Sequence, residues 1–273
     1  SRPGFRGMFI DQPYGGSFVP TVDNMRKAFE KKIQLDDADM RYITSLYDQG
    51  IRYTDTRLGV FIRYLMDQGY LDDTALIITS DHGEEFGEHG STLHWQVFFQ
   101  PNLRIPLIIR MPGGTSREIR IDFQVELIDL LPTILDWVGA EPLQAAQGTS
   151  FADTMAHAHY SWQGWMQREL ARLRPDPTAY AWGAVIGTPW RSVLRGRFQL
   201  IFFEGAPKAN QLFDIEADPF AQHNLAAENT HVVEQMREEG LRVMSADRSP
   251  DAEASTALDA ESEEQLRALG YLQ

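Results

Sequence analysis

The chain contains no cysteine and few lysines. The absence of Cys from its 273 residues excludes disulfides, thiolate metal ligands and cysteine nucleophiles within them. Arginine supplies most of the positive charge, because the only lysines are Lys27, Lys31, Lys32 and Lys208. The formal net charge is -14, and so acidic a surface repels nucleic acids and anionic membranes. We therefore expect no nucleic-acid partner, and an anionic substrate would need a local positive charge.

Long apolar runs are also missing. The longest, residues 127–138, contains Asp129, Pro132 and Asp136 and is too short to span a bilayer. The chain starts at Ser1 without an initiator methionine or an apolar leader, so we expect a soluble protein with no targeting or membrane segment in these residues. The compartment and the oligomeric state stay open. An apolar content of 43% still allows a sizeable core.

A long helix is the clearest predicted element. Residues 1–34 begin with Gly- and Pro-rich turns. Apolar side chains then recur at three- and four-residue spacing over residues 40–65, which is typical of one buried helix face. Asp36 or Asp37 can cap this helix, and Gly69 can end it.

Two buried strands follow the helix. β-branched and other apolar residues predict strands at 75–79 and 104–110, and residues 125–138 predict another helix. This order favours an α/β fold, with part of a mixed, mostly parallel sheet flanked by helices.

The pattern changes after about residue 150. Residues 151–177 look helical, and residues 227–245 predict a charged helix. Short strands separated by turns are expected at 180–186, 191–194, 198–203 and 211–213. We therefore divide the chain into an α/β part at 1–150, a small antiparallel α+β subdomain at 151–248, and an acidic linker and tail at 249–273.

Asp81 and His82 are the strongest candidates for chemistry. They follow the first strand, and ligands of open α/β sheets bind beyond the carboxyl ends of strands. Both side chains can reach one ion only where the strand breaks into a loop, which Gly83 permits. A carboxylate and a neutral imidazole suit Mn²⁺ or Zn²⁺ and, less well for the histidine, Ca²⁺. The alternative is that Asp81 caps a turn and His82 has no special role.

His94 is the next candidate, because it lies in the same loop. It could donate a hydrogen bond to a substrate oxygen or protonate a leaving group, or it could be ordinary polar surface. His89 is a weaker version of the same idea. Three nearby carboxylates could be metal ligands, but we interpret them as a solvated face: Glu84, Glu85 and Glu88.

Arg104 and Asp129 are weaker candidates for a functional role, and no nucleophile motif is found. Arg104 could contact a phosphate or sulfate, although an ion pair with a carboxylate is the preferred interpretation. Asp129 is interpreted as a helix N-cap. The sequence has no Gly-x-Ser-x-Gly elbow, Walker loop or dinucleotide fingerprint.

Taken together, several segments resemble the sulfatase family of the alkaline-phosphatase superfamily. The resemblance covers nearly all of residues 38–226, and its short matches follow one another in family order. The matching segments are LYDQGIRYTDTRLGVFIRYLMDQGYLDDTALIITSDHGEEFGEHG, LRIPLIIRMPG, VELIDLLPTILDWVGAEP, QGTSF, RGRFQLIFF and QLFDIEADPFAQHNLA, with LRALGYL near the end.

The resemblance implies roles for three residues. Asp81 and His82 match the pair that completes the divalent-metal site, for which we expect Ca²⁺ first, with Mn²⁺ or Zn²⁺ as alternatives. His94, within HWQVFF, matches the catalytic Lys or His that binds the sulfate group near the leaving oxygen. Trp95 and Phe98 differ from the residues usual in the family.

The main departure from the family lies at the front of the chain. Family members carry two acidic metal ligands and a Cys- or Ser-x-Pro-x-Arg motif whose first residue becomes formylglycine, the nucleophile. Residues 1–20 resemble sequence that begins after this region. We therefore expect the C-terminal half of a sulfatase-like protein, with formylglycine upstream and no activity of this chain alone.

Three functions remain open from the sequence. The first is a metal-dependent sulfuric ester hydrolase that acts on a sulfated small molecule or glycan. The second is a phosphate or phosphonate ester hydrolase of the same superfamily, since both anions are tetrahedral. The third is a non-catalytic interaction protein that keeps the fold. The Asp81-His82-Gly83 sequence argues against the third, because a buried charge at a strand end is costly without a function.

Overall fold

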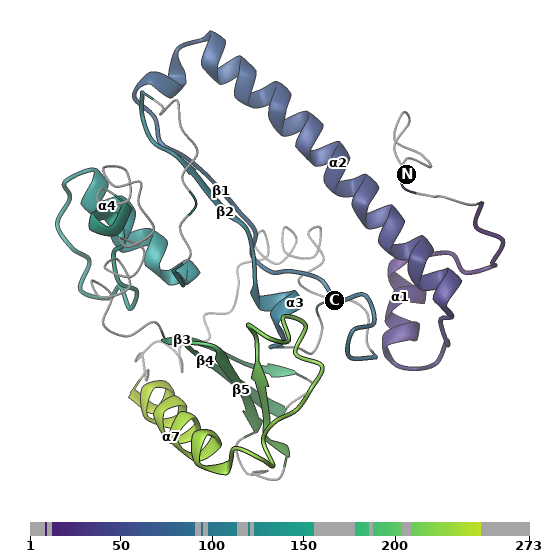
Figure 1. Ribbon diagram of the computed structural model, residues 1–273. Coiled ribbons are helices and arrows are strands. Elements are labelled where there is room, and N and C mark those ends of the chain that lie inside the picture. The colour runs from purple at the N-terminus through teal and green to yellow at the C-terminus, as the bar shows by residue number, and fades with distance from the viewer. Residues whose placement is uncertain are drawn as a thin grey trace, which may run out of the picture.

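The computed structural model describes residues 9, 13–90, 94, 98–113, 120, 123–155, 178–185, 188–203 and 209–246. Most of the expected helical region 151–177 and all of the expected linker and tail 249–273 lie outside these residues. The helices are α1 (Val22–Phe29), α2 (Asp37–Asp67), α3 (Gln100–Leu103), α4 (Leu130–Trp137) and α7 (Thr230–Ala246), with 3₁₀ turns η1 (Tyr70–Asp72) and η2 (Leu127–Asp129). The strands are β1 (Leu76–Thr79), β2 (Leu107–Arg110), β3 (Thr178–Val185), β4 (Thr188–Arg195), β5 (Phe198–Phe203) and β6 (Gln211–Asp214) (Figure 1).

The long helix α2 confirms the sequence prediction at both ends. The Asp36 carboxylate accepts hydrogen bonds from the backbone N–H groups of Ala38 and Asp39, both at 2.8 Å. Gly69 follows the last turn with φ 74°, the left-handed conformation that ends many helices. Several large apolar side chains of α2 are nevertheless exposed: Tyr47, Ile51, Val60, Phe61, Tyr64 and Met66. The described residues therefore leave much of its apolar stripe uncovered.

The first sheet has an arrangement that the sequence did not predict. β1 and β2 pair antiparallel, with Leu76 opposite Arg110 and Thr79 opposite Leu107. Every strand pair among the described residues is antiparallel, so the mostly parallel sheet is not confirmed, and the observed class is mixed α/β with antiparallel sheets. The long connection through α3 lets the chain reverse direction before β2. Both strands are only partly buried, and Ile108 is 59% exposed.

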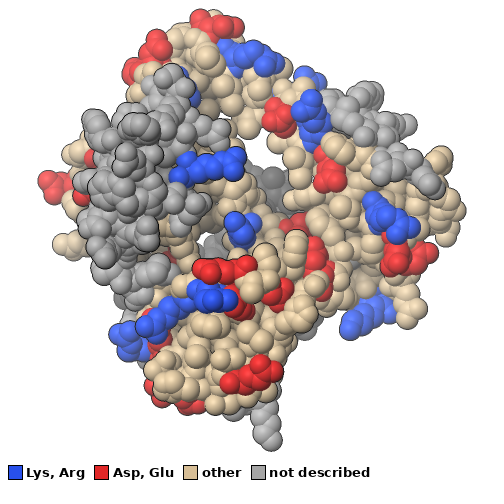
Figure 2. All heavy atoms as spheres, viewed as in Figure 1, with Lys and Arg blue, Asp and Glu red and all other residues tan. Residues whose placement is uncertain are grey.

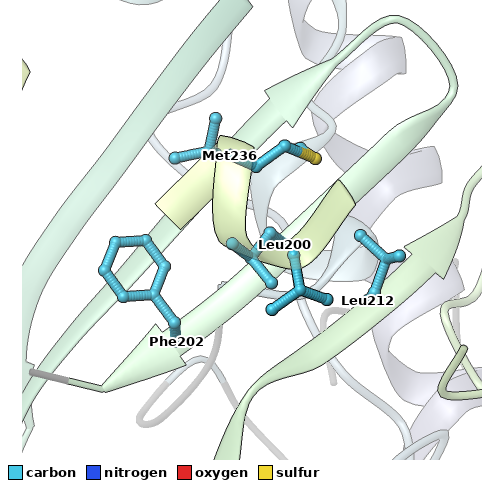
Figure 3. Close-up of a cluster of buried hydrophobic side chains, with 6 residues drawn as sticks. Leu200, Phe202, Leu212 and Met236 are labelled. Atoms are coloured by element: carbon cyan, nitrogen blue, oxygen red, sulfur yellow. The ribbon is translucent and has the colours of Figure 1, made fainter. Parts of the chain in front are cut away.

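The second sheet confirms the antiparallel prediction. Its strand order is β3-β4-β5-β6, and the β4–β5 turn contains Gly196 with φ 57°. Because successive strand residues point to opposite faces, β5 builds two cores. Leu200 and Phe202 pack with Leu212 and with Met236 of α7 on one face (Figure 3).

The other face of this sheet holds the segment that precedes β2. Ile201 and Phe213 form a second buried cluster with Phe99, the residue before α3. Beside it, the Gln199 side chain is fully buried and hydrogen-bonds to Gln100 at 3.1 Å and to Ser192 at 3.0 Å. These contacts dock α3 onto the C-terminal sheet.

Two short helices were missed by the sequence analysis. α1 follows Pro20 with Thr21 as its N-cap, and α3 contains Pro101 in its first turn. α1 lies in the region that begins with Gly- and Pro-rich turns, and α3 lies in the loop predicted between the first two strands. Acidic and basic side chains are interspersed over the described surface in view (Figure 2). In the part of the chain that the structure describes, no helix combines the length and apolar character needed to cross a membrane.

Candidate active site

Gly83 determines the path of the loop that follows β1. The Gly83 N–H donates to the Asn102 carbonyl at 2.8 Å, and the Glu84 N–H donates to the Pro101 carbonyl at 3.1 Å. A Cβ atom on Gly83 would lie 1.9 Å from the Pro101 carbonyl oxygen. Only glycine therefore fits where the loop passes α3, and the C-terminal sheet holds α3 in turn.

The structure brings Asp81 and His82 together at the surface. The His82 Nε2 atom lies 3.9 Å from Asp81 Oδ2, and the two side chains are 35% and 59% exposed. His82 Nδ1 lies 2.7 Å from the Gly83 carbonyl, which can only accept, so Nδ1 carries the proton. This tautomer leaves the Nε2 lone pair free for a metal ion.

His94 joins this pair. Its ring lies against the His82 ring, with centroids 4.0 Å apart and planes tilted by 31°. His94 Nδ1 also lies 3.4 Å from Glu84 Oε2. The Glu84 carboxylate raises the pKa of His94, Asp81 adds to this increase, and together they outweigh the opposite effect of burial. Three residues predicted from the sequence therefore form one cluster, and Glu84 contacts its third member, His94.

The positions of Glu84 and Glu85 differ from those that the sequence predicted. Glu85 is fully buried and the Glu84 side chain is only 17% exposed, so neither belongs to a solvated face. Glu85 bonds to His89, whose Nε2 lies 2.9 Å from the Ala221 carbonyl. Both nitrogens of His89 are thus engaged within the protein, and His89 cannot contact a substrate as the sequence suggested. The contact of His89 with Ala221 joins segments far apart in the chain, which no local pattern reveals.

Arg104 and Asp129 have separate environments. Arg104 is exposed, and its expected ion pair does not form with any carboxylate of the described residues. Asp129 is buried and accepts hydrogen bonds from the backbone N–H groups of Glu126 at 2.8 Å and Thr149 at 2.7 Å. Asp129 therefore caps the start of η2, close to the predicted role.

The Asp81–His82 pair fits a divalent metal ion. An ion bound at roughly 2.0–2.6 Å brings two ligand atoms within about 3–5 Å of each other, and the observed separation is 3.9 Å. The oxygen and nitrogen donors also suit such an ion. The described residues contain no group of three or more His, Asp or Glu side chains arranged to hold a metal. They therefore supply two ligands of a possible site.

Sequence comparison places these residues in known families. The sulfatase family profile matches residues 12–140, and the profile of the N-sulphoglucosamine sulphohydrolase C-terminal region matches residues 87–246. The two matches overlap across the loop with His89 and His94, and the second covers more than half of the chain.

Curated relatives agree with the profiles. A multifunctional alkaline phosphatase superfamily protein of Trinickia caryophylli is 34% identical over 54% of this chain and 28% of its own length. An N-acetylglucosamine-6-O-sulfatase of Bacteroides thetaiotaomicron is 28% identical over 63% of this chain and 30% of its length. A choline-sulfatase of Rhizobium meliloti is 28% identical over 77% of this chain and 38% of its length. The chain thus spans about a third of the relatives that it matches.

Solved structures share the fold. A 2-O GAG sulfatase superposes with a TM-score of 0.67 at 21% identity, covering 88% of this chain and 50% of its own. A phosphonate monoester hydrolase of Agrobacterium radiobacter superposes with a TM-score of 0.60 at 24% identity, covering 78% and 43%. From these matches and the family profiles, the chain belongs to the sulfatase family of the alkaline phosphatase superfamily.

Proposed function

We propose that the complete protein containing this chain is a metal-dependent sulfuric ester hydrolase that acts on a sulfated glycan or small molecule. The observation that carries the proposal is the pairing of Asp81 Oδ2 with His82 Nε2 at 3.9 Å, at the end of β1, in a chain of the sulfatase family. Family membership supports the reaction class, and this geometry supports a metal-binding role for Asp81 and His82.

Asp81 and His82 would hold a divalent ion, with Ca²⁺ as the first choice and Mn²⁺ or Zn²⁺ as alternatives. Such an ion supplies positive charge that activates a nucleophile and offsets negative charge on the sulfate oxygens. The chain contains no Cys, so a formylglycine nucleophile derived from Cys would come from residues outside it. The remaining metal ligands would come from the same source.

His94 would bind the sulfate group and donate a proton toward the departing oxygen. Glu84 supports this role, because its carboxylate lies 3.4 Å from His94 Nδ1 and raises the pKa of the imidazole. The protonated imidazole carries a hydrogen on each nitrogen, so it can bond to Glu84 and still have a second proton to donate. In this arrangement Glu84 is a positioning residue and His94 the catalytic residue.

The proposal also includes the surrounding architecture. We infer that β1 and β2 belong to a larger mixed sheet in the complete protein, because both strands are only partly buried here. Residues 1–150 would form part of that catalytic domain, and residues 151–248 would form the smaller subdomain that supports α3.

The test compares Asp81→Ala and His94→Ala with the control Asp55→Asn in the complete protein. Asp55 is an exposed carboxylate of α2 that pairs with Arg52 at 3.3 Å. Loss of a metal ligand should weaken Ca²⁺ or Mn²⁺ binding by more than about 100-fold in calorimetric titration. Loss of the proton donor should lower kcat on an aryl sulfate by about 10²–10⁴-fold without changing metal affinity. Undiminished turnover by Asp81→Ala would rule out the metal role.

A phosphate or phosphonate ester hydrolase is the second candidate. It is favoured by the relative of Trinickia caryophylli, which is named as a multifunctional superfamily protein and is the most identical of those compared above. The residues of the cluster suit either tetrahedral anion. Values of kcat/KM on matched aryl sulfate, phosphate and phosphonate esters would decide, and a preference for phosphorus would replace the sulfatase assignment.

A further inference from the structure

Glu85 and His89 form a buried pair that the proposed function does not use. They lie four residues apart in the loop after β1, where the Glu85 side chain is 0% exposed and that of His89 13% exposed. One carboxylate oxygen bonds to His89 Nδ1, whereas the other has no hydrogen-bond partner among the described residues. A carboxylate in such surroundings is costly unless it is paired, so the contact with His89 is needed to keep it there.

The contacts of His89 fix the number of protons in this pair. His89 Nε2 lies 2.9 Å from the Ala221 carbonyl, which has no hydrogen to give, so Nε2 carries a proton. The bond between Nδ1 and Glu85 then needs one further proton. It resides either on the imidazole, beside a carboxylate, or on Glu85, beside a neutral imidazole. In both cases the pair is neutral overall, which suits its burial.

The partner of this pair belongs to the C-terminal subdomain and is held rigidly. Ala221 is fully buried with φ 54°, a conformation that non-glycine residues rarely adopt. The turn is fixed by Asp218, whose backbone carbonyl accepts from the Ala221 N–H at 3.0 Å. The Asp218 carboxylate also accepts from the N–H groups of Gln222 and His223, both at 2.7 Å. The turn therefore holds the Ala221 carbonyl oxygen in position to accept the hydrogen bond from His89 Nε2.

Packing around the imidazole strengthens the connection. The His89 ring stacks on Phe99 with centroids 3.5 Å apart and planes 7° apart, and Phe99 packs against Phe213 of β6. The same ring therefore touches the core of the C-terminal sheet and bonds to its turn. His89 therefore connects the loop after β1 to the C-terminal sheet in two ways: its ring nitrogen bonds to Ala221, and the face of its ring stacks on Phe99.

We propose that Glu85 and His89 are positioning residues that anchor the loop carrying Asp81 and His82 to the C-terminal sheet. Glu85 and His89 follow Gly83 in the loop, whereas Asp81 and His82 precede it. Fixing the first pair therefore restricts the position of the second. This inference rests on the proposed metal role of Asp81 and His82. It makes the C-terminal subdomain a determinant of metal affinity, although none of its described residues reaches the site.

The test uses His89→Ala, Glu85→Ala and Glu85→Gln in the complete protein. His223→Ala is the matched control, because His223 also pairs with a carboxylate, at 3.3 Å from Asp218, but is 82% exposed on the same turn as Ala221. Two readouts are measured: hydrogen–deuterium exchange of peptides covering residues 81–90, and the affinity for Ca²⁺ and Mn²⁺ by calorimetric titration.

Both alanine variants should exchange faster over residues 81–90 and bind metal about 10–100-fold more weakly. Glu85→Gln should retain wild-type behaviour, because its amide N–H can donate to Nδ1 of a neutral His89 while Nε2 still donates to Ala221. His223→Ala should change neither readout. If the alanine variants fail to fold, Glu85→Gln still tests the proton count: in ¹⁵N-histidine NMR, His89 should be protonated at Nε2 in both wild type and variant.

Three results would overturn the inference. The first is unchanged exchange in His89→Ala, and the second is an Nε2 without a proton. The third is faster exchange with unaltered metal affinity in His89→Ala, when Asp81→Ala does lose metal. Failure of the proposed function has a different signature, because Asp81→Ala would then keep its metal affinity whatever the exchange experiment shows.

Discussion

Replacing Gly83 with alanine is the most direct test of how the site loop is held. The new methyl group would lie 1.9 Å from the Pro101 carbonyl oxygen and 3.2 Å from Asn102 Cα. Both neighbours are backbone atoms, so neither can rotate away as a flexible side chain would. The loop must therefore separate from α3 or distort it.

The structure gives the size of the effect. Overpacking of this kind costs about 1–3 kcal/mol. Separation also weakens the two backbone hydrogen bonds that join Gly83 and Glu84 to the α3 segment, at 2.8 and 3.1 Å. Two such bonds are worth about 1–3 kcal/mol together. Gly83→Ala should therefore lower the free energy of unfolding by about 2–6 kcal/mol.

Urea unfolding of the complete protein measures this loss, and metal titration measures the displacement of Asp81 and His82. Gly50→Ala is the control, because a Cβ there has no neighbour within 4 Å and Gly50 lies inside α2. That control should gain about 0.5–1 kcal/mol from the better helix former. If Gly83→Ala matched the wild type in both stability and metal affinity, the close contact with α3 would be refuted.

Three other predictions concern packing, pH and exposed surface. Gly240→Ala should be less stable than Gly50→Ala by about 1–3 kcal/mol in urea titration, because both gain the same helix propensity but the Cβ at Gly240 would lie 2.6 Å from a Val193 methyl group; equal stability of the two variants would contradict the α7 contact. Burial lowers the pKa of His89, but hydrogen bonds to Glu85 and the Ala221 carbonyl and the charge of Glu88 raise it above 6.5 overall. The stabilising contribution of His89 should be complete below pH 6.5 and lost as the pH rises through the raised pKa, so the urea concentration at the midpoint of unfolding should fall over that range. A urea midpoint that rises with pH across the same range would oppose this prediction. The isolated chain should bind a hydrophobic dye through the exposed stripe of α2, whereas a monodisperse chain without dye binding would disagree.

Local sequence signals predicted much of the fold. α2 follows an uninterrupted apolar period with a carboxylate before it and glycine after it, so its limits needed no tertiary information. The strands of the second sheet were found because turns separate them. α1 and α3 were missed because both are short: α1 lies in a region that begins with Gly- and Pro-rich turns, and α3 lies in the polar loop that follows the first predicted strand.

The candidate site divides in the same way. Asp81 and His82 were found because they are adjacent at a strand end. The burial of Glu84 and Glu85 was not, because a run of glutamates ordinarily indicates solvent. The four-residue spacing of Glu85 and His89 predicts a contact only on a helix, and these residues lie in a loop. The sequence therefore indicated neither this pair nor its partner, Ala221.

The buried side chain of Gln199 has a consequence for assembly. It is satisfied only by Gln100, Ser192 and a backbone carbonyl, all of which meet it in one pairing of β4 with β5. A slip of one residue would turn Gln199 toward α7 and present Leu200 to these polar groups. Docking of the segment before β2 therefore requires the observed alignment of β4 with β5, and so does the position of the loop after β1, which contacts that segment.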